Sequence, residues 1–548
     1  MSILIEYLSS KQSYILLIFE DCVVILINRA KKYFLNALIL SCASLILRAI
    51  GVAFNARISS YIGSAGMGLL TLTAGIYGFA ITFACSGINL AVVRLVSSDL
   101  AKGGGRIAKT MRAAVCYCLF FSISASVILF SFSGLIGGAI LGDSRVIPSI
   151  RLFAISLPAI SISSAINGYF CAVRRVYKNV LSQFLEQGIR LCIVSYLLIL
   201  MTPSGLELAC AAVVGGGVIS EIGGAVFSGA LYFLDRKIHS STSSSDEKTT
   251  SKSELSEICS VSLPVAISAY ARSALSTLEH LAIPWGLRRR GLDYNSSISS
   301  YGVLHGMAIP LLLFPSAVLG AFSSLLIPEL SEAYAFGNNA RIRYIVSRVF
   351  ALSLLFSVGV SGIFISFSYE IGTFIYGSRE AGEYIRLLAP LIPLMYLDGA
   401  VDAMLKGLGE QLYTMRVNIS DSLISLILII FLLPRLGISG YVVVIFITEM
   451  FNTSFSIIKL LNITGVKTPV MKWVVKPLFG IVLSTLAARF LLDHNIITSI
   501  FGLVPYGKGY VFFEIGITAI IYIIISRIIG TISKDDVEWG KRLLSNAK

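Results

Sequence analysis

Charged residues are scarce in this sequence. Only 14% of its 548 residues are Asp, Glu, Lys or Arg, whereas an average soluble domain has about 25%. Hydrophobic residues make up 56%, the mean hydropathy is +0.83, and the apolar residues come in long runs without a period of two. This composition excludes a soluble globular protein and predicts an all-α integral membrane protein that crosses the bilayer many times.

The usual marks of an enzyme or a metalloprotein are also missing. No HExxH, GxSxG, P-loop or Rossmann motif occurs, and no loop exceeds about 20 residues, which is too short for a catalytic domain of about 50. The nine cysteines all precede Ser260 and mostly sit inside apolar runs, as small packing residues do. The four histidines are scattered at His239, His280, His305 and His494. We therefore predict no catalytic residues, no metal site and no cofactor.

An arginine lies in the first apolar stretch, where a bilayer disfavours charge. If that helix begins near residue 33, Arg48 lies roughly 22 Å along it, past the middle of a hydrocarbon layer about 30 Å thick. Helical spacing places it in a polar stripe with Ser41, Ser44, Asn55 and Ser59. A charge at this depth marks a candidate functional site, although a buried arginine satisfied by carbonyls and a carboxylate would give the same pattern. We predict that Arg48 and Asn55 bind substrate.

The seventh apolar stretch repeats this pattern in the second half of the chain. Ser268, Arg272, Ser276 and Glu279 share one helical face. Arg272 is the natural partner of Arg48 across a cavity, because neither arginine has an acid on its own face within one turn. We therefore assign Arg272, Ser276 and Glu279 to the same substrate site.

Other charged residues lie inside the apolar stretches. Glu186 and Arg190 are four residues apart, and this spacing favours a structural ion pair over a substrate contact. Asp398, Asp421 and Glu449 are possible sites of coupling to H⁺ or Na⁺. For Glu449, a buried acid kept neutral by a raised pKa is an equally good reading.

Apolar runs of about 20 residues predict about fourteen spans. They are 34–61, 68–94, 110–137, 147–172, 180–201, 206–234, 256–283, 299–328, 343–371, 382–406, 412–433, 437–460, 471–493 and 509–530. Pro310 and Pro315 predict a kink or hinge in the eighth span.

A Ser-, Thr- and charge-rich run, 235–254, separates two six-helix sets and predicts a flexible cytoplasmic linker between two lobes. The expected domains are an N-terminal cytoplasmic or interfacial segment (1–33), an N-lobe (34–234), this linker, a C-lobe (255–460) and a C-terminal helix pair with its tail (461–548).

Basic residues alternate between the connecting loops and set the orientation. The loops that hold most of the lysines and arginines fall on one side, which predicts that both termini are cytoplasmic. The net charge of +14 is explained by these loops, so nucleic acid is not implied. The triplet Arg288–Arg290 lies on the wrong side. Either it has a second role, or the neighbouring basic loops outweigh it.

Several motifs resemble stage V sporulation protein B-like members of the polysaccharide-exporter branch of the multidrug, oligosaccharidyl-lipid and polysaccharide (MOP) flippase superfamily. The resemblance runs from about Asn36 to the last span. It is carried by Arg48–Gly51, Ile62–Leu69, Ser86–Ile88, Arg94–Val96, Ile283–Pro284, Leu287–Arg289, Tyr301–Gly302, His305–Pro310 and Pro328–Ala333.

The resemblance implies two V-shaped lobes that open alternately around an undecaprenyl-diphosphate-linked saccharide. The sequence is also similar to lipid II flippases, in which cavity arginines hold the diphosphate; Arg48 matches the first of these, and Phe54 stands where the second would be. We therefore expect a flippase for a lipid-linked oligosaccharide or cell-wall precursor in the bacterial cytoplasmic membrane. A cation-coupled multidrug exporter of the same fold, a membrane-embedded glycosyltransferase or polymerase, and a non-transporting scaffold are the alternatives. The cargo, the coupling ion and the oligomeric state do not follow from the sequence.

Overall fold

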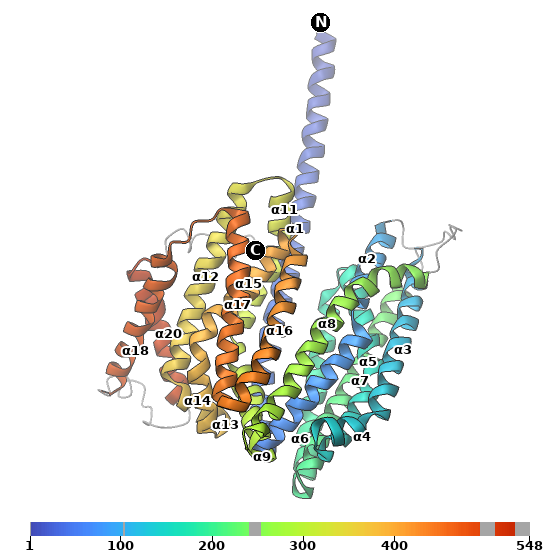
Figure 1. Ribbon diagram of the computed structural model, residues 1–548. Helices are drawn as coiled ribbons and strands as arrows, with labels where there is room; N and C mark the ends of the chain where they lie inside the picture. The colour runs from blue at the N-terminus through green and yellow to red at the C-terminus, as the bar shows by residue number, and fades with distance from the viewer. Residues whose placement is uncertain (1, 102–104, 240–253, 494–509, 532–548) are drawn as a thin grey trace.

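The computed structural model describes residues 2–101, 105–239, 254–493 and 510–531. Within these ranges every regular element is a helix (Figure 1). The predicted all-α class is therefore confirmed. Most of the predicted linker, 240–253, lies outside the described residues.

The first half of the chain contains four long helices after a kinked first helix. Its elements are α1 (Ser2–Cys85), α2 (Ile88–Ala101), α3 (Ile107–Ser131), α4 (Ser133–Leu135), the π-helical turn η1 (Ile136–Leu141), the 3-10 turn η2 (Ser144–Val146), α5 (Ile147–Ala172), α6 (Val176–Met201), the 3-10 turn η3 (Thr202–Ser204) and α7 (Leu206–His239).

The second half has more breaks. Its elements are α8 (Glu254–Arg289), α9 (Tyr294–Tyr301), the π-helix η5 (Gly302–Ala308), α10 (Ile309–Leu313), α11 (Ser316–Ala335), α12 (Asn339–Ser366), α13 (Ser368–Tyr376), α14 (Arg379–Leu388), the 3-10 turn η6 (Ala389–Leu391), α15 (Ile392–Gly407), α16 (Gln411–Leu436), α17 (Ile438–Thr464), the π-helix η7 (Met471–Val475), α18 (Lys476–Asp493) and α20 (Tyr510–Ile528).

Thirteen stretches of the described residues are long and apolar enough to cross a membrane. The first, Ala43–Ala101, is 59 residues long, roughly twice what a bilayer of about 40–45 Å requires at about 1.5 Å per residue. It bends at Gly63, whose φ of 65° is open to glycine at little cost, and it breaks again after Cys85. This stretch overlaps the first two predicted spans. The total of fourteen stays a prediction.

The eighth predicted span, for which we expect a kink or hinge, is divided between separate helices. α10 ends at Leu313 and α11 begins at Ser316, after Pro315. Proline cannot donate the backbone hydrogen bond that would continue the helix through this point. The break between α10 and α11 lies beside α1, where Ser316 contacts Arg48.

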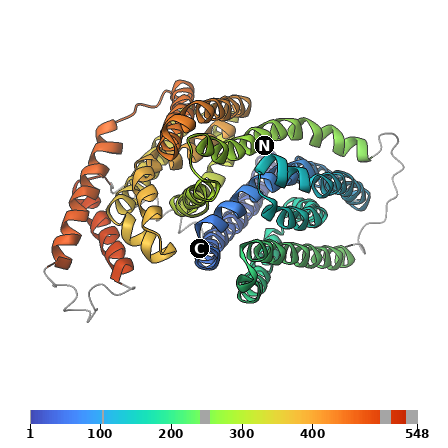
Figure 2. The same ribbon diagram turned by 60° about the horizontal axis from the view of Figure 1, so that its bottom comes forward.

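Helix α8 crosses from one half of the molecule to the other (Figures 1 and 2). At the end where α7 finishes and α8 begins, which we call the linker end, Arg106 before α3 pairs with Glu254 and Glu257 of α8 at 3.7 and 3.4 Å. At the opposite end, which we call the Asp143 end, a Cβ on Gly286 would lie 2.7 Å from the Cβ of Leu433 in α16. α8 is therefore packed on the first half at one end and on the second half at the other.

The two halves approach most closely through glycines at the Asp143 end. A Cβ on Gly302 would lie 2.2 Å from the carbonyl oxygen of Ser64, and a Cβ on Gly68 would lie 2.1 Å from that of Ile298. No other residue fits at such distances, so α1 packs backbone to backbone on α9 and η5. Beside this contact Tyr301 is fully buried.

The last two described helices, α18 and α20, pack on the outside of α12 (Figure 1). Tyr522 of α20 donates a hydrogen bond to the carbonyl oxygen of Leu355 at 2.8 Å, and its ring lies over Gly359. Ile481 of α18 fills the space at Gly362 in the same way. The assignment of residues 461–548 to a C-terminal helix pair and tail stays a prediction.

Candidate substrate-binding cavity

A cavity of about 490 Å³ lies beside the middle of α1, between both halves of the chain. Its walls come from α1, α5, α6, α7 and the α10 segment. They consist of Leu47, Arg48, Gly51, Val52, Phe54, Asn55, Ile58, Leu70, Ala74, Phe153, Gln187, Arg190, Val194, Val213, Val214, Gly217, Pro310, Leu313 and Phe314. These described residues include two arginines and no Asp or Glu. Two predicted substrate residues, Arg48 and Asn55, are therefore in this lining.

The side chain of Arg48 is exposed and reaches toward the second half. Its Nη1 donates a long hydrogen bond of 3.4 Å to Ser316 Oγ of α11, and it forms no ion pair with any described residue. The alternative in which a carboxylate neutralises a buried Arg48 finds no support in these contacts. Most of the five donors of this guanidinium remain available to a ligand.

Arg190 is the second cationic group of the cavity, and its partner differs from the predicted one. Its Nη2 lies 3.7 Å from Glu221 Oε1 of α7, whereas Glu186 forms no ion pair with a described residue. Tyr77 of α1 donates a hydrogen bond of 2.8 Å to the other carboxylate oxygen of Glu221. The prediction of a Glu186–Arg190 pair is wrong, because the acid that reaches the guanidinium belongs to the neighbouring helix.

Small residues of α7 make room for these side chains of α6. A Cβ on Gly217 would lie 3.2 Å from Arg190 Nη2, and a Cβ on Gly224 would lie 3.0 Å from Glu186 Oε2. The glycines let α6 and α7 pack closely while a guanidinium lies between them. Tyr77 and Phe153, stacked with their ring centroids 4.0 Å apart, close the side of the cavity next to Glu221.

The other predicted substrate residues lie elsewhere. Arg272, Ser276 and Glu279 are not among the residues that line the cavity. Arg272 is exposed on α8, and Glu279 accepts a hydrogen bond of 2.5 Å from Ser425 of α16. The expectation that Arg48 and Arg272 share a cavity is not met, because α8 crosses between the halves, and the second arginine that lines the cavity with Arg48 is Arg190.

A polar network lies among three helices of the second half. Asn452 of α17 donates to Asp398 Oδ2 and to Asn418 Oδ1, both at 3.4 Å, and Asn418 of α16 donates to Asp402 Oδ2 at 3.5 Å. Lys406 lies 3.6 Å from Asp402. The network therefore links α15, α16 and α17.

Two further acids lie near this network. Glu449 accepts a hydrogen bond of 3.2 Å from Thr453 on its own helix. Asp398 Oδ1 and Asp421 Oδ1 are buried without a hydrogen-bond donor among the described residues, and an unpaired buried oxygen of this kind is costly. Within the same residues no cluster of three or more His, Cys, Asp or Glu has the geometry of a metal site.

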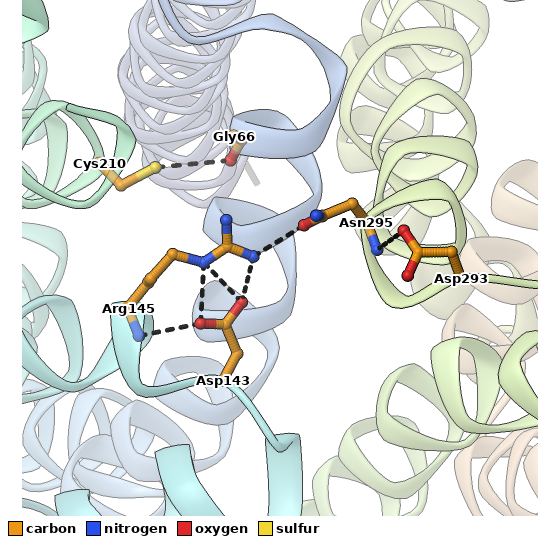
Figure 3. Close-up of polar contacts among 6 residues, drawn as sticks. All are labelled: Gly66, Asp143, Arg145, Cys210, Asp293 and Asn295. Carbon is orange, nitrogen blue, oxygen red and sulfur yellow. Dashed lines mark hydrogen bonds and ion pairs between the residues drawn. The ribbon is translucent and has the colours of Figure 1, made fainter.

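Polar contacts hold the two halves together at the Asp143 end (Figure 3). Asp143 caps η2 and pairs with Arg145 at 2.6 Å, and Arg145 Nη2 donates to Asn295 Oδ1 of α9 at 3.0 Å. Burial alone would raise the pKa of Asp143, but the hydrogen bonds from Arg145 outweigh it, so this pKa lies below its usual value. Ser64 and Ser299 add a hydrogen bond of 2.6 Å nearby.

The basic triplet has structural contacts at the same end. Arg288 lies over the ring of Tyr294, Arg289 lies over the ring of Trp285, and Arg290 Nη1 donates to the carbonyl oxygen of Leu436. These contacts tie α8 to α9 and α16. They give the triplet the second role that the sequence left open.

Two curated proteins of Bacillus subtilis (strain 168) are similar to the chain. Stage V sporulation protein B is 26% identical over 416 residues, which cover 75% of this chain and 80% of the relative. Lipid II flippase MurJ is 23% identical over 443 residues, covering 75% and 79%.

Solved structures share the fold. A lipid II flippase MurJ in an inward closed conformation superposes with a TM-score of 0.66 at 14% identity, covering 90% of this chain and 99% of the other. An inward-facing multidrug resistance MATE family transporter of the MOP superfamily gives 0.61 at 15% identity, covering 78% and 98%. The expected MOP-type architecture is therefore confirmed.

The family of the chain is assigned from a match that covers its first half and its central segment. Residues 34–334 match the family described as polysaccharide biosynthesis protein. This range contains α8 to α10 and both arginines of the cavity. Because it is more than half of the sequence, the chain belongs to the polysaccharide biosynthesis protein family.

Proposed function

We propose that the protein is a flippase that moves a lipid-linked saccharide across the bacterial cytoplasmic membrane, with the diphosphate bound between Arg48 and Arg190. The observation that carries this proposal is a cavity lined by two arginines and no acid in the middle of an apolar bundle. Guanidinium groups bind the oxygens of a diphosphate with paired hydrogen bonds and keep their charge at every physiological pH. The names of the relatives, lipid II flippase among them, support the same cargo class.

The apolar part of the lining suits the rest of such a cargo. Phe54, Phe153 and Phe314 surround the arginines, and apolar walls around a few charged groups are typical of sites for amphiphilic ligands. The lipid tail then stays in the bilayer while the headgroup crosses inside the protein.

Alternating access supplies the movement. The glycine contacts and the Arg145–Asn295 bond hold the Asp143 end closed. The basic loops favour a cytoplasmic linker end and cytoplasmic termini. The cavity is then loaded from the cytoplasm, and it releases cargo outside when the contacts at the Asp143 end separate.

The second half supplies coupling in this proposal. Asp398, Asp421 and Glu449 exchange H⁺ or Na⁺ as the halves move, because two of them have buried oxygens without donors. The same acids favour the second candidate, a cation-coupled exporter of cationic drugs.

The deciding experiment uses the purified full chain in proteoliposomes. A fluorescent undecaprenyl-diphosphate disaccharide is added to both leaflets, and dithionite quenching measures its movement. Ethidium efflux in the same vesicles tests the drug-exporter candidate. We expect movement of the lipid-linked disaccharide above that of empty vesicles and of Arg48→Ala vesicles. Ethidium efflux without movement of the disaccharide would overturn the flippase assignment.

A further inference from the structure

A second cavity, of about 650 Å³, lies at the linker end, apart from the substrate cavity. Its walls come from the start of α12, the segment after α17 and the π-helix η7. The lining residues are Arg343, Tyr344, Ser347, Arg348, Ala351, Gly465, Val466, Lys467, Lys472 and Trp473. They include four basic residues and no acid, and none of them lines the substrate cavity.

The basic residues of this cavity are held by local structure. Gly465 ends α17 in the left-handed conformation, with φ of 63°, and turns the chain back toward α12. The carbonyl oxygen of Pro469 accepts the backbone N–H groups of Lys472 and Trp473 at 2.9 and 3.0 Å, which starts η7. Trp473 is only 5% exposed and stacks on Phe350 of α12. Lys472 is thereby placed next to the first turns of α12.

Most of this positive charge has no protein partner. Arg343, Lys467 and Lys472 form no ion pair within the part of the chain that the structure describes. Arg341, two residues earlier, lies 3.6 Å from Glu329 and 3.7 Å from Glu332. Acids are therefore within reach of the start of α12, but none of them lines the cavity. An anionic ligand would neutralise the remaining cations.

The surroundings of the cavity point to a lipid. Val470 and Met471, directly before Lys472, are 57% and 65% exposed, and Val475 is exposed on the next turn. Aromatic side chains such as Tyr344 and Trp473 are common where a bilayer meets water. A ligand that satisfies both parts of the site carries a phosphate group for the basic residues and acyl chains for the exposed apolar side chains.

We propose that this cavity binds the phosphate headgroup of an anionic phospholipid from the leaflet at the linker end. Arg343 and Lys472 contact the phosphate from opposite walls, and Lys467 lies at the rim. The acyl chains lie along Val470, Met471 and Val475. The site rests on its own charge and geometry, and it stands whether or not the chain is a flippase.

Native mass spectrometry of the delipidated full chain in detergent tests the site. We expect phosphatidylglycerol to bind more tightly than phosphatidylethanolamine, which has no net charge. The double variant Arg343→Gln/Lys472→Gln should weaken the first phosphatidylglycerol site roughly thirtyfold, given the contribution of each of the two basic residues near a lipid surface. The matched control is Lys109→Gln/Arg112→Gln, which removes two exposed charges from α3 at the same end.

Three outcomes would overturn the proposal. The control pair could weaken binding as much as the test pair, which would mean general attraction to the basic surface. Inorganic phosphate at millimolar concentration could displace the lipid, which would assign the cavity to a soluble anion. The charge-preserving variant Arg343→Lys/Lys472→Arg could lose binding although its melting temperature is unchanged. This result would mean that the positive charge of the cavity does not determine lipid binding.

Discussion

The polar groups inside the two halves of the molecule differ in kind. In the first half, Arg48 and Arg190 line a cavity without an acid. In the second half, Asp398 and Asp402 belong to a network of amides and carboxylates, with Lys406 at its edge. A cavity of the first kind suits an anionic group and a network of the second kind suits a cation. From this difference we expect cargo binding and ion coupling to lie in separate halves, so that substitutions should affect one without the other.

The largest effect should come from the first half. Arg48→Ala should lower the movement of the lipid-linked disaccharide by at least tenfold, since a charge-assisted hydrogen bond to a phosphate oxygen contributes about 1.5–3 kcal/mol. Arg48→Lys should restore part of the rate, because an ammonium cannot make the paired contact of a guanidinium. The dithionite assay measures both variants.

Arg57→Ala is the matched control for Arg48→Ala. Arg57 is exposed on the same helix and does not line the cavity. It should transport at the wild-type rate. If Arg48→Ala instead fails to accumulate as folded protein while Arg57→Ala accumulates normally, Arg48 has a structural role. The first half would then lack the basic substrate site on which the comparison between the halves depends.

The second half should give a different kind of loss. Asp398→Asn should slow transport about tenfold and remove its dependence on a pH or Na⁺ gradient, while cargo affinity changes by no more than about twofold. The physical reason is that the amide keeps the hydrogen bond with Asn452 but can neither bind a proton at neutral pH nor attract a cation. Glu370→Gln, an exposed acid on α13, serves as the control.

Transport with and without a gradient, together with cargo binding to the same vesicles, tests this variant. Unchanged gradient dependence in Asp398→Asn would move coupling to another acid, such as Asp421 or Glu449. A loss of cargo affinity would instead place the acid network in the substrate site and break the division between the halves.

The ion pair of the first half should affect stability more than chemistry. Glu221→Ala leaves Arg190 without its partner and removes the hydrogen bond of Tyr77. Breaking a buried pair costs about 3–5 kcal/mol, but Arg190 is 37% exposed, so about 1–2 kcal/mol is expected after screening by solvent. Glu186→Ala should cost less, because no described basic group pairs with Glu186. Thermal unfolding in detergent measures both, and equal losses would restore the pairing of Glu186 with Arg190.

Local features of the structure were predictable from the sequence, and contacts between distant helices were not. The polar stripe of Arg48 and the break at Pro315 follow from helix periodicity and from the missing amide of proline. The partner of Arg190 depends on which face of α7 meets α6, and that contact is determined by Gly217 and Gly224. One signal was available: Glu221 is an acid in the middle of an apolar stretch, and such a residue requires a partner.

The wrong placement of Arg272 has a different cause. Pairing it with Arg48 assumed that the first helix of each half faces the same cavity. α8 instead contacts Arg106 of the first half at the linker end and packs on α16 from Ser425 to Leu433. The polar residues of α8 were correctly assigned to one helical face. Which helices contact that face depends on how α8 crosses between the two halves, and no local sequence pattern determines that crossing.

The smallest effect should come from the contacts at the Asp143 end, where a single hydrogen bond from Arg145 to Asn295 joins the two halves beside the Asp143–Arg145 pair. Asn295→Ala removes the hydrogen bond from Arg145 across the halves and should lower the melting temperature by no more than a few degrees, since such a bond contributes about 1 kcal/mol.

The contribution of Asp143 to stability should depend on pH with a definite sign. Because the pKa of Asp143 is lower in the folded protein, its contribution to stability is complete above the unfolded value of about 3.9 and is lost as the pH falls through the folded value. Asp143→Asn should therefore be less stable than wild type at pH 6, and the difference should shrink as the pH falls below about 4. Melting temperatures of both chains across this range test it. A difference that grows on acidification would mean that the protonated acid stabilises this end, and the contact would then be strongest in acid.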